Sequence, residues 1–299
     1  MTVPHFTWLF FLLGFLSCKQ SASPSADQKE WSQLFNHKDL TGWDIKIAGH
    51  DLNENFNNNF YVQDSVLKVD YSKFSKFDKE FGHLYYKEPF SWYVVRVEYR
   101  FTGQQLTGGP SYAYLNSGVM LHSQSAASLS KNQSFPVSLE MQLLASDEKQ
   151  KRHNGNLCTP GTQVSMNGQP VDAHCIDSKS KNSYLNDWVT AEAVVCGDSI
   201  IHHIINGDTV LTYEKPRVGG GFVNTGLTWT SGGFAADSLD WIKKDGMPLK
   251  SGYIALQAES HPVEFRKVEL LNLEGCMDPA ALNYKSYYLK ADNTKCRYK

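Results

Sequence analysis

The stretch Ser138–Asp147, SLEMQLLASD, has the clearest structural pattern in the chain. Apolar and polar residues alternate along it, as in a strand with one face in a core and the other face open. The residues assigned to the core face are Leu139, Met141 and Leu143. Glu140 and Gln142 then lie two residues apart on the open face. A carboxylate and an amide at this spacing can contact one ligand, although a solvated strand face has the same pattern.

The composition predicts a strand-rich protein. The 299 residues are enough for one large β domain or two medium ones, and 41% apolar and 13% aromatic residues can supply a core. Tyr, Phe, Trp, Gly and Asn are abundant, and no long helical pattern is visible, which favours an all-β sandwich. A net charge of -2 gives no reason to expect nucleic acid or an anionic membrane surface as a partner.

The N-terminus resembles a bacterial lipoprotein signal. The apolar run Trp8–Leu16 is short for a membrane span, and it ends at Ser17-Cys18 before a polar segment. This pattern predicts a signal over residues 1–18, with Cys18 as the lipidated first residue of the mature protein, and a tether over 19–29. The protein would then be exported and lipid-anchored in the cell envelope, touching the membrane through this lipid only. A plain secretory signal is the alternative.

Export makes disulfides the natural interpretation of four cysteines. Cys158 and Cys175 flank one loop, and Cys276 and Cys296 flank another in the C-terminal tail. Each pair would close a loop of roughly 20 residues, which the chain-entropy model values at about 3 kcal/mol. Cys196 lies in an apolar strand and is expected to be a buried free thiol. A zinc site is disfavoured because no CxxC or HxxxH spacing occurs.

Strand patterns fill residues 30–274, and long loops are expected at 103–116, 145–187 and 214–250. The expected strands are 60–69, 82–86, 93–101, 117–122, 137–144, 188–195, 199–205, 209–213, 252–257 and 263–273. Residues 275–299 form a separate small module that resembles short Cys-closed modules at the ends of exported proteins. Its Asx residues, which suit either a calcium loop or Asx turns, are Asp278, Asn283, Asp292 and Asn293.

An ordered set of motifs carries a family resemblance. It comprises LFNxxDLxGW at 34–43, NSGVML at 116–121, EMQL at 140–143, DW at 187–188, IING at 204–207, and GYIALQ with VEFRKV at 252–257 and 263–268. Over residues 30–274 the chain resembles the 3-keto-disaccharide hydrolase domain family. The resemblance implies a concanavalin A-like jelly roll with a ligand groove over one sheet, and action on glycosides oxidised at C3. QAESHP at 257–262 and the Cys158/Cys175 loop depart from the commonest family pattern.

A 3-keto group acidifies the C2 hydrogen of the sugar, so a base can remove it and the C1 substituent can leave; water addition completes a net hydrolysis. Such a site needs a base, an oxyanion stabiliser and an acid. Glu140 is the candidate base, and Gln142 would orient the sugar. His202 is the candidate acid, with His203 as the alternative, because neighbouring strand residues face opposite ways and the pattern does not choose between them.

A second polar cluster is expected at the end of the strand 252–257. Gln257, Glu259 and His261 are its candidate substrate-binding residues, and His122 would join Glu140 if their strands pair. Arg266 is a candidate stabiliser of the enolate, or else a structural partner of Glu264 or Glu269.

No cofactor is firmly implied. A divalent cation is one way to stabilise an enolate, with Glu140, His122, Glu259 and His261 as its prospective ligands. Exposed aromatic residues could stack on sugar rings, although core packing explains each of them as well; they are Trp43, Tyr61, Trp229 and Trp241.

The sequence thus predicts an exported carbohydrate-active enzyme whose partner is a saccharide. A non-catalytic glycan-binding lipoprotein of the same shape is the alternative, and a purely structural lipoprotein is the third reading.

Overall fold

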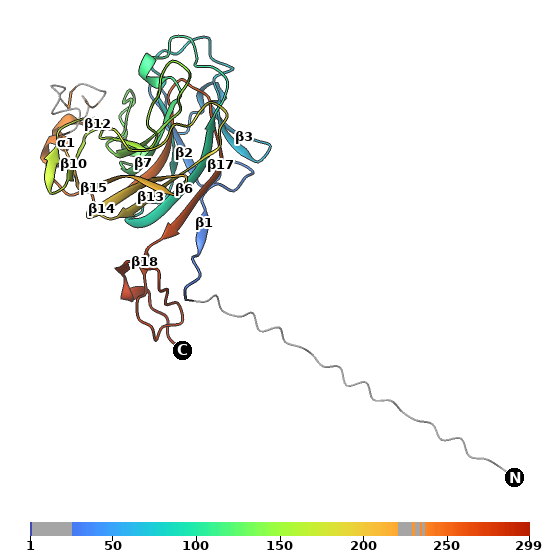
Figure 1. Cartoon of the computed structure of the whole chain (residues 1–299), viewed down its shortest axis with the longest axis vertical. Helices are drawn as coiled ribbons and strands as arrows, with labels where there is room; N and C mark the ends of the chain where they lie inside the picture. Colours follow the sequence, from blue (N-terminus) through green and yellow to red (C-terminus); the bar gives the residue numbers. More distant parts are fainter. Residues whose placement is uncertain (2–25, 221–228, 231–233, 235–236) are drawn as a thin grey trace.

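In the computed structural model two antiparallel sheets pack face to face as a jelly-roll sandwich (Figure 1). The structure describes residues 1, 26–220, 229–230, 234 and 237–299. The ten-stranded sheet has the order β11-β10-β15-β14-β13-β6-β17-β4-β3, with β1 also paired to β17, and the seven-stranded sheet has the order β12-β9-β8-β7-β16-β5-β2. The all-β jelly roll expected from the sequence is confirmed. Among the described residues the one α-helix is α1 (Ser238–Lys243).

The strands of the ten-stranded sheet are β1 (Trp31–Gln33), β3 (Phe60–Gln63), β4 (Val66–Val69), β6 (Trp92–Phe101), β10 (Thr162–Met166), β11 (Gln169–Val171), β13 (Val189–Cys196), β14 (Ile200–Ile205), β15 (Asp208–Val218) and β17 (Val263–Asn272). Those of the seven-stranded sheet are β2 (Trp43–Ile47), β5 (Gly82–Tyr86), β7 (Asn116–Ser123), β8 (Leu139–Leu144), β9 (Asn156–Cys158), β12 (Cys175–Ile176) and β16 (Tyr253–Ala258).

Two expectations about the strands need correction. The segment 60–69 is a hairpin rather than one strand, because Asp64 and Ser65 both take positive φ angles and turn the chain between β3 and β4. The expected loop 145–187 contains the four short strands β9 to β12, which extend both sheets at one end. Their brevity and polar composition hid them from period-two analysis.

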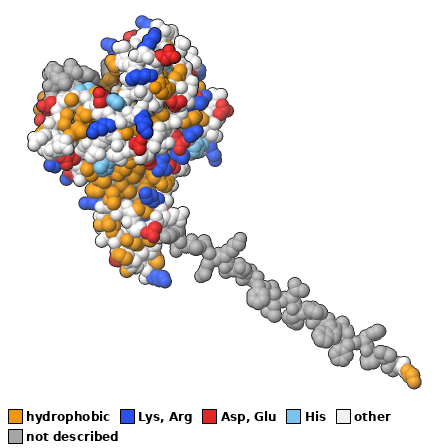
Figure 2. Space-filling model, in the orientation of Figure 1, with side chains coloured by type: hydrophobic (Ala, Val, Ile, Leu, Met, Phe, Trp, Pro, Cys, Tyr) orange, Lys and Arg blue, Asp and Glu red, His pale blue; other side chains and the backbone are white. Residues whose placement is uncertain are grey.

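The outer face of the ten-stranded sheet is occupied by its own charged residues. Arg96 pairs with Glu192 at 2.6 Å and with Glu269 at 2.7 Å, and its guanidinium lies 4.0 Å from the Trp31 ring centroid. The guanidiniums of Arg100 and Arg266 lie over the ring of Trp188. Opposite charges on neighbouring strands thus satisfy one another across this face. On the side of the molecule seen in Figure 2, acidic and basic side chains are interspersed.

On the outer face of the seven-stranded sheet, part of the surface is covered by the loop between β7 and β8. Ala126 and Leu129 of this loop pack on Met120 and Tyr85. Lys46 on β2 holds the loop in place. The buried Nζ of Lys46 donates to the carbonyl oxygens of His50 at 2.6 Å, Lys131 at 3.1 Å and Ile47 at 3.3 Å.

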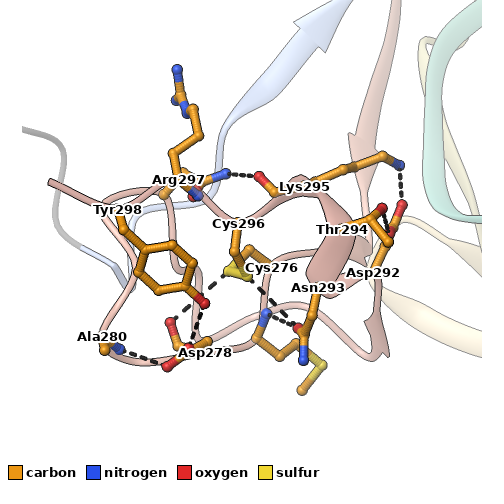
Figure 3. Close-up of a disulfide and its surroundings, with 12 residues drawn as sticks. Cys276, Asp278, Ala280, Asp292, Asn293, Thr294, Lys295, Cys296, Arg297 and Tyr298 are labelled. Atoms are coloured by element: carbon orange, nitrogen blue, oxygen red, sulfur yellow. Dashed lines mark hydrogen bonds and ion pairs between the residues drawn. A yellow bond between two sulfur atoms is a disulfide. The ribbon is translucent and has the colours of Figure 1, made fainter.

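The C-terminal module is closed by the disulfide Cys276–Cys296, and the second expected disulfide, Cys158–Cys175, is also present. The Asx side chains of the C-terminal module form hydrogen bonds within that module (Figure 3). Tyr298 donates to Asp278 at 2.6 Å, and the N–H of Met277 donates to Asn293 at 3.2 Å. The N–H of Ala280 also donates to Oδ1 of Asp278 at 2.9 Å, which is the contact of an Asx turn. The module contacts the start of the domain through an ion pair between Lys285 and Glu30.

Cys196 is a buried free thiol, as expected. None of the helices among the described residues has the length and apolar character needed to cross a membrane. The predicted signal and Cys18 lie outside the described residues.

We predict that Lys46→Met lowers the free energy of unfolding by about 2 kcal/mol, because buried carbonyl groups lose a charged donor. Urea unfolding followed by tryptophan fluorescence would measure this. Lys87→Met is the matched control: Lys87 is exposed and lies 3.5 Å from Asp44 on the same edge of the sheet, and its loss should cost about 0.5 kcal/mol or less. Equal costs for the two variants would contradict the anchoring role of Lys46.

Candidate functional site

A row of polar residues crosses the outer face of the seven-stranded sheet. The strand register places Lys46 opposite His83 and His83 opposite Gln257, and it places Glu140 opposite Met120. The alternation of each strand sends the neighbouring apolar residues to the other face, where they form the core between the sheets. The outer face therefore gathers, from separate strands, side chains that are distant in the sequence.

Glu140 is the central group of this face, and only 6% of its surface is exposed. A Cβ on Gly118 of the adjacent strand β7 would lie 2.7 Å from Oε1 of Glu140, so the absent side chain at Gly118 gives the carboxyl its space. Burial raises the pKa of Glu140 to about 8. At neutral pH this carboxyl therefore holds a proton for much of the time.

Glu259, which follows β16, is the second carboxyl of the site and is buried. Burial, and secondly the charge of Glu140, raises the pKa of Glu259 well above its ordinary value. The two carboxyls are thus close enough to influence one another. Burial and then the charge of Glu259 raise the pKa of Tyr112 to about 12, so the Tyr112 side chain also lies near this pair.

Several buried polar atoms of this site have no hydrogen-bond partner among the described residues. They include both amide atoms of Gln257, Nε2 of His83 and Oε2 of Glu259. Gln257 is fully buried, and His83 is exposed by only 1%. Burial lowers the pKa of His83 to about 3, which keeps its ring neutral. Because buried polar atoms in proteins are normally hydrogen-bonded, this concentration marks a place suited to a polar ligand.

Comparison with known proteins identifies the family. The model of the 3-keto-alpha-glucoside-1,2-lyase-like domain matches residues 30–271. The chain belongs to this family. Comparison with curated proteins gave no match.

Solved structures with similar chains include a candidate glycosyl hydrolase of Parabacteroides distasonis, 15% identical over 82% of this chain and 100% of that chain, with a TM-score of 0.47. The carbohydrate-binding module CBM66 of Bacillus subtilis is 8% identical over 82% of this chain and 96% of that chain, with a TM-score of 0.39.

In this lyase-like domain, the structure brings some of the residues predicted from sequence together and leaves others outside the site. Glu140, Gln142, Gln257 and Glu259 come from β8 and from β16 with the residues that follow it, and they lie on or beside the outer face of the seven-stranded sheet. Gln142 is partly buried, and its Oε1 accepts from Asn156 at 3.3 Å. His261 is buried between the rings of Tyr114 and Phe101, and burial lowers its pKa to about 4.

The expectation that His202 shares the groove with Glu140 is wrong. His202 lies on the outer face of the ten-stranded sheet, where its Nδ1 is 2.9 Å from Oγ1 of Thr212. The alternative, His203, points between the sheets, and its ring nitrogens bond the carbonyl of Gly155 and the hydroxyl of Tyr213. Neither histidine is near the carboxyl pair, because both belong to the other sheet.

Arg266 and His122 are also not part of the site. Arg266 pairs with Glu98 at 2.6 Å on the outer face of the ten-stranded sheet, so it has a structural partner, although not one of the expected two. The strands of His122 and Glu140 do pair, but the irregularity between β16 and β7 turns His122 away. Its φ is 48°, and its Nε2 lies 3.2 Å from the carbonyl oxygen of Gly197.

The prospective cation site loses a ligand by this displacement of His122. Within the described part of the chain, no group of three or more His, Cys, Asp or Glu side chains is arranged to hold a metal ion. The proposed sugar-stacking tryptophans are core residues: Trp43 is 5% exposed, and Trp229 and Trp241 stack on one another with ring centroids 5.8 Å apart. Tyr61 is partly buried in β3.

Sequence reasoning missed His83, Gly118, Asn156 and Tyr112. His83 lies in the alternating strand 82–86, and the same parity argument that selected Glu140 applies to it. Gly118 is informative only once its strand is known to lie beside Glu140. Asn156 and Tyr112 come from segments with no periodic pattern.

The raised pKa of Glu140 predicts a pH-dependent stability difference for Glu140→Gln. Between about pH 4.5 and 8 the folded protein keeps a proton on Glu140 that the unfolded chain releases, so this carboxyl makes stability fall as pH rises. A glutamine side chain does not titrate, so it adds no such pH dependence to the stability. We expect Glu140→Gln to match the parent near pH 4 and to exceed its Tm by on the order of 5 °C at pH 8.5.

Thermal unfolding followed by circular dichroism across this pH range measures the difference. Exposed Glu148 provides the control, since Glu148→Gln should show no growing difference. A Tm difference for Glu140→Gln that shrinks with rising pH would show that the carboxyl is ionised in the folded protein.

Proposed function

We propose that the protein is an enzyme that cleaves 3-keto-glycosides by removing the C2 proton and expelling the C1 substituent. The observation that carries this proposal is the pair of buried carboxyls, Glu140 and Glu259, beside the unpaired amide of Gln257. Two titratable groups whose environments separate their proton affinities can serve as base and acid at one pH. Membership in the lyase-like family supports the substrate class.

Each group has an assigned role. Glu140, in its ionised fraction, takes the C2 proton, and the electrons of the C2–H bond move toward the C3 carbonyl to form an enolate. Nε2 of Gln257 donates a hydrogen bond to the C3 oxygen of this enolate and stabilises its charge. Burial and the charge of Glu140 raise the pKa of Glu259, and Glu259 donates its proton to the departing C1 oxygen. Glu259 replaces His202 as the acid.

After elimination the proton positions are reversed, with Glu140 protonated and Glu259 ionised. Glu259 can then take a proton from a water that adds to C1, while Glu140 returns its proton to C2. The two additions complete a net hydrolysis and restore both carboxyls to their starting state. If the unsaturated sugar leaves first, the same site acts as a lyase.

We predict that the domain 30–299 releases the aglycone from 3-keto-glycosides and that Glu140→Gln lowers kcat by about a thousandfold while ligand binding stays within a few fold. Glu259→Gln should lose most activity on poor leaving groups and least on nitrophenyl glycosides, which need no acid. Released aglycone measures the activity of both variants, and calorimetry measures ligand binding by Glu140→Gln. Repeating the activity assay with EDTA tests for a contributing cation. His202→Ala is the control, since His202 lies on the other sheet.

A glycan-binding module without chemistry is the second candidate, because unpaired polar atoms on a sheet face can equally bind a sugar. The two functions differ in one result. A binding module holds saccharides but releases no aglycone from any 3-keto-glycoside, and Glu140→Gln then has no turnover to change.

We further propose that the protein is exported and lipid-anchored through Cys18, which the two disulfides support, since such bonds persist in oxidising compartments. In a bacterial host, Cys18→Ser should shift the full chain from the membrane fraction to the soluble fraction or block its processing. An immunoblot of the fractions measures this. Retention of the variant in the membrane at the parent's level and size would refute the anchor.

A further inference from the structure

The disulfide Cys158–Cys175 lies beside the carboxyl pair, in the same row of side chains as Glu140. The strand register pairs Glu140 with Cys158 between β8 and β9, and it pairs Cys158 with Cys175 between β9 and β12. Residues directly opposite one another in an antiparallel pair put their side chains on the same face, with Cβ atoms about 5 Å apart. The disulfide is therefore on the outer face of the seven-stranded sheet, next to the side chain of Glu140.

A second sulfur group flanks Glu140 from the other side. Met120 on β7 lies opposite Glu140 and is fully buried, and Cys158 is only 3% exposed. A Cβ on Gly118 would lie 2.7 Å from Oε1 of Glu140 and 2.7 Å from the methyl carbon of Met120, so these two side chains approach one another over Gly118. A thioether and a disulfide offer a carboxylate no hydrogen-bond donor. Along its row, Glu140 is thus flanked by apolar groups.

These apolar flanks account for the state of Glu140, since burial is what raises its pKa to about 8. Other ionisable side chains face this region from the neighbouring segments: Glu259 after β16, Tyr112 before β7, Lys151 and Arg152 after β8, and Asp177 after β12. A change at the disulfide leaves all of them in the chain. It would therefore act on the pKa of Glu140 chiefly through the access of water to this carboxyl.

The flank made by the disulfide is the edge of the sheet, where the main chain alone holds little in place. The edge strand β12 has two residues, Cys175–Ile176, and it pairs only with Cys158 and Leu157 of β9. Beyond β12 the N–H of Ser178 donates to Oδ1 of Asn156 at 2.9 Å, so the following segment has its own attachment. Loss of the disulfide would thus loosen β12 locally without releasing the whole segment.

We propose that the Cys158–Cys175 disulfide is a positioning element of the carboxyl site, which holds β12 beside Glu140 and keeps water from that flank. Reduction of the bond then opens the flank. The inference rests on the proposed function for the use that is made of Glu140. It goes beyond that function by making the site sensitive to the redox state of one bond.

Reduction by a dithiol balances as two thiol–disulfide exchanges. A thiolate of the dithiol attacks Sγ of Cys175, which is the exposed member of the pair, and Sγ of Cys158 leaves with the bonding electrons and takes up a proton. The second thiol of the dithiol displaces Sγ of Cys175, which also takes up a proton. The dithiol leaves as a cyclic disulfide, oxidised by the two electrons that the protein disulfide gains.

The test follows the carboxyl carbon of Glu140 by carbon-13 NMR in protein with labelled glutamate, and the spectrum of Glu140→Gln identifies this signal. Cys175→Ser should lower the titration midpoint so that the proton affinity falls about tenfold, because water then reaches the carboxyl. Cys276→Ser/Cys296→Ser is the matched control. It removes a disulfide of similar sequence separation, 20 against 17 residues, in the C-terminal module, and it should change the affinity less than about twofold.

A fall of less than about threefold for Cys175→Ser, a rise, or an equal fall in the control overturns the positioning role. Near-ultraviolet circular dichroism confirms that each variant is folded. If Cys175→Ser does not fold, dithiothreitol added to folded Cys276→Ser/Cys296→Ser protein breaks the same bond. The midpoint should then fall and return on reoxidation, and a midpoint that dithiothreitol leaves in place overturns the proposal equally.

Turnover gives a separate readout. With a 3-keto-glycoside, kcat/KM should rise with pH as Glu140 ionises, and Cys175→Ser should move this rise to lower pH by the same factor of about ten. A midpoint that moves in a protein without turnover supports the positioning role and removes the enzyme proposal. Turnover with an unmoved midpoint and an unmoved pH profile supports the enzyme proposal and overturns the positioning role.

Discussion

The pleat of β8 ties the core of this protein to its site. Leu139, Met141 and Leu143 are fully buried between the sheets, and this burial fixes the direction of Glu140 and Gln142 on the opposite face. A shift of one residue in the register would place the carboxylate in the core and a leucine in the site. The large apolar area between the sheets therefore determines, to within one residue, which polar groups meet on the outer face.

Burying two carboxyls near one another opposes folding. On the outer face of the ten-stranded sheet, charged residues such as Arg96 and Glu192 pair with one another. On the seven-stranded sheet the polar atoms of Gln257 and Glu259 remain unpaired among the described residues. Several unpaired polar atoms beside carboxyls with raised pKa values are typical of a functional site.

The sequence was sufficient for the sandwich and for half of the site, and physical reasons separate the two halves. Period-two alternation gave the direction of Glu140 and Gln257 correctly because both lie in regular strands. It placed His202 beside them wrongly, since alternation gives a residue's face but not the sheet to which its strand belongs. His122 lies on a strand that pairs with that of Glu140, as expected, but its positive φ turns its side chain away from Glu140. No residue type near His122 in the sequence indicates this irregularity.

The raised pKa values of the two buried carboxyls favour the proposed catalytic role over a binding role. A neutral sugar is held as well by amides and hydroxyls, which are far cheaper to bury than carboxyls. A pair of buried carboxyls provides, in addition, the proton donor and acceptor that the proposed reaction needs. Gly118 adds to this argument: the missing side chain favours the carboxyl of Glu140 at the expense of packing on β7. The cost is understandable if the carboxyl must meet a substrate atom at that point.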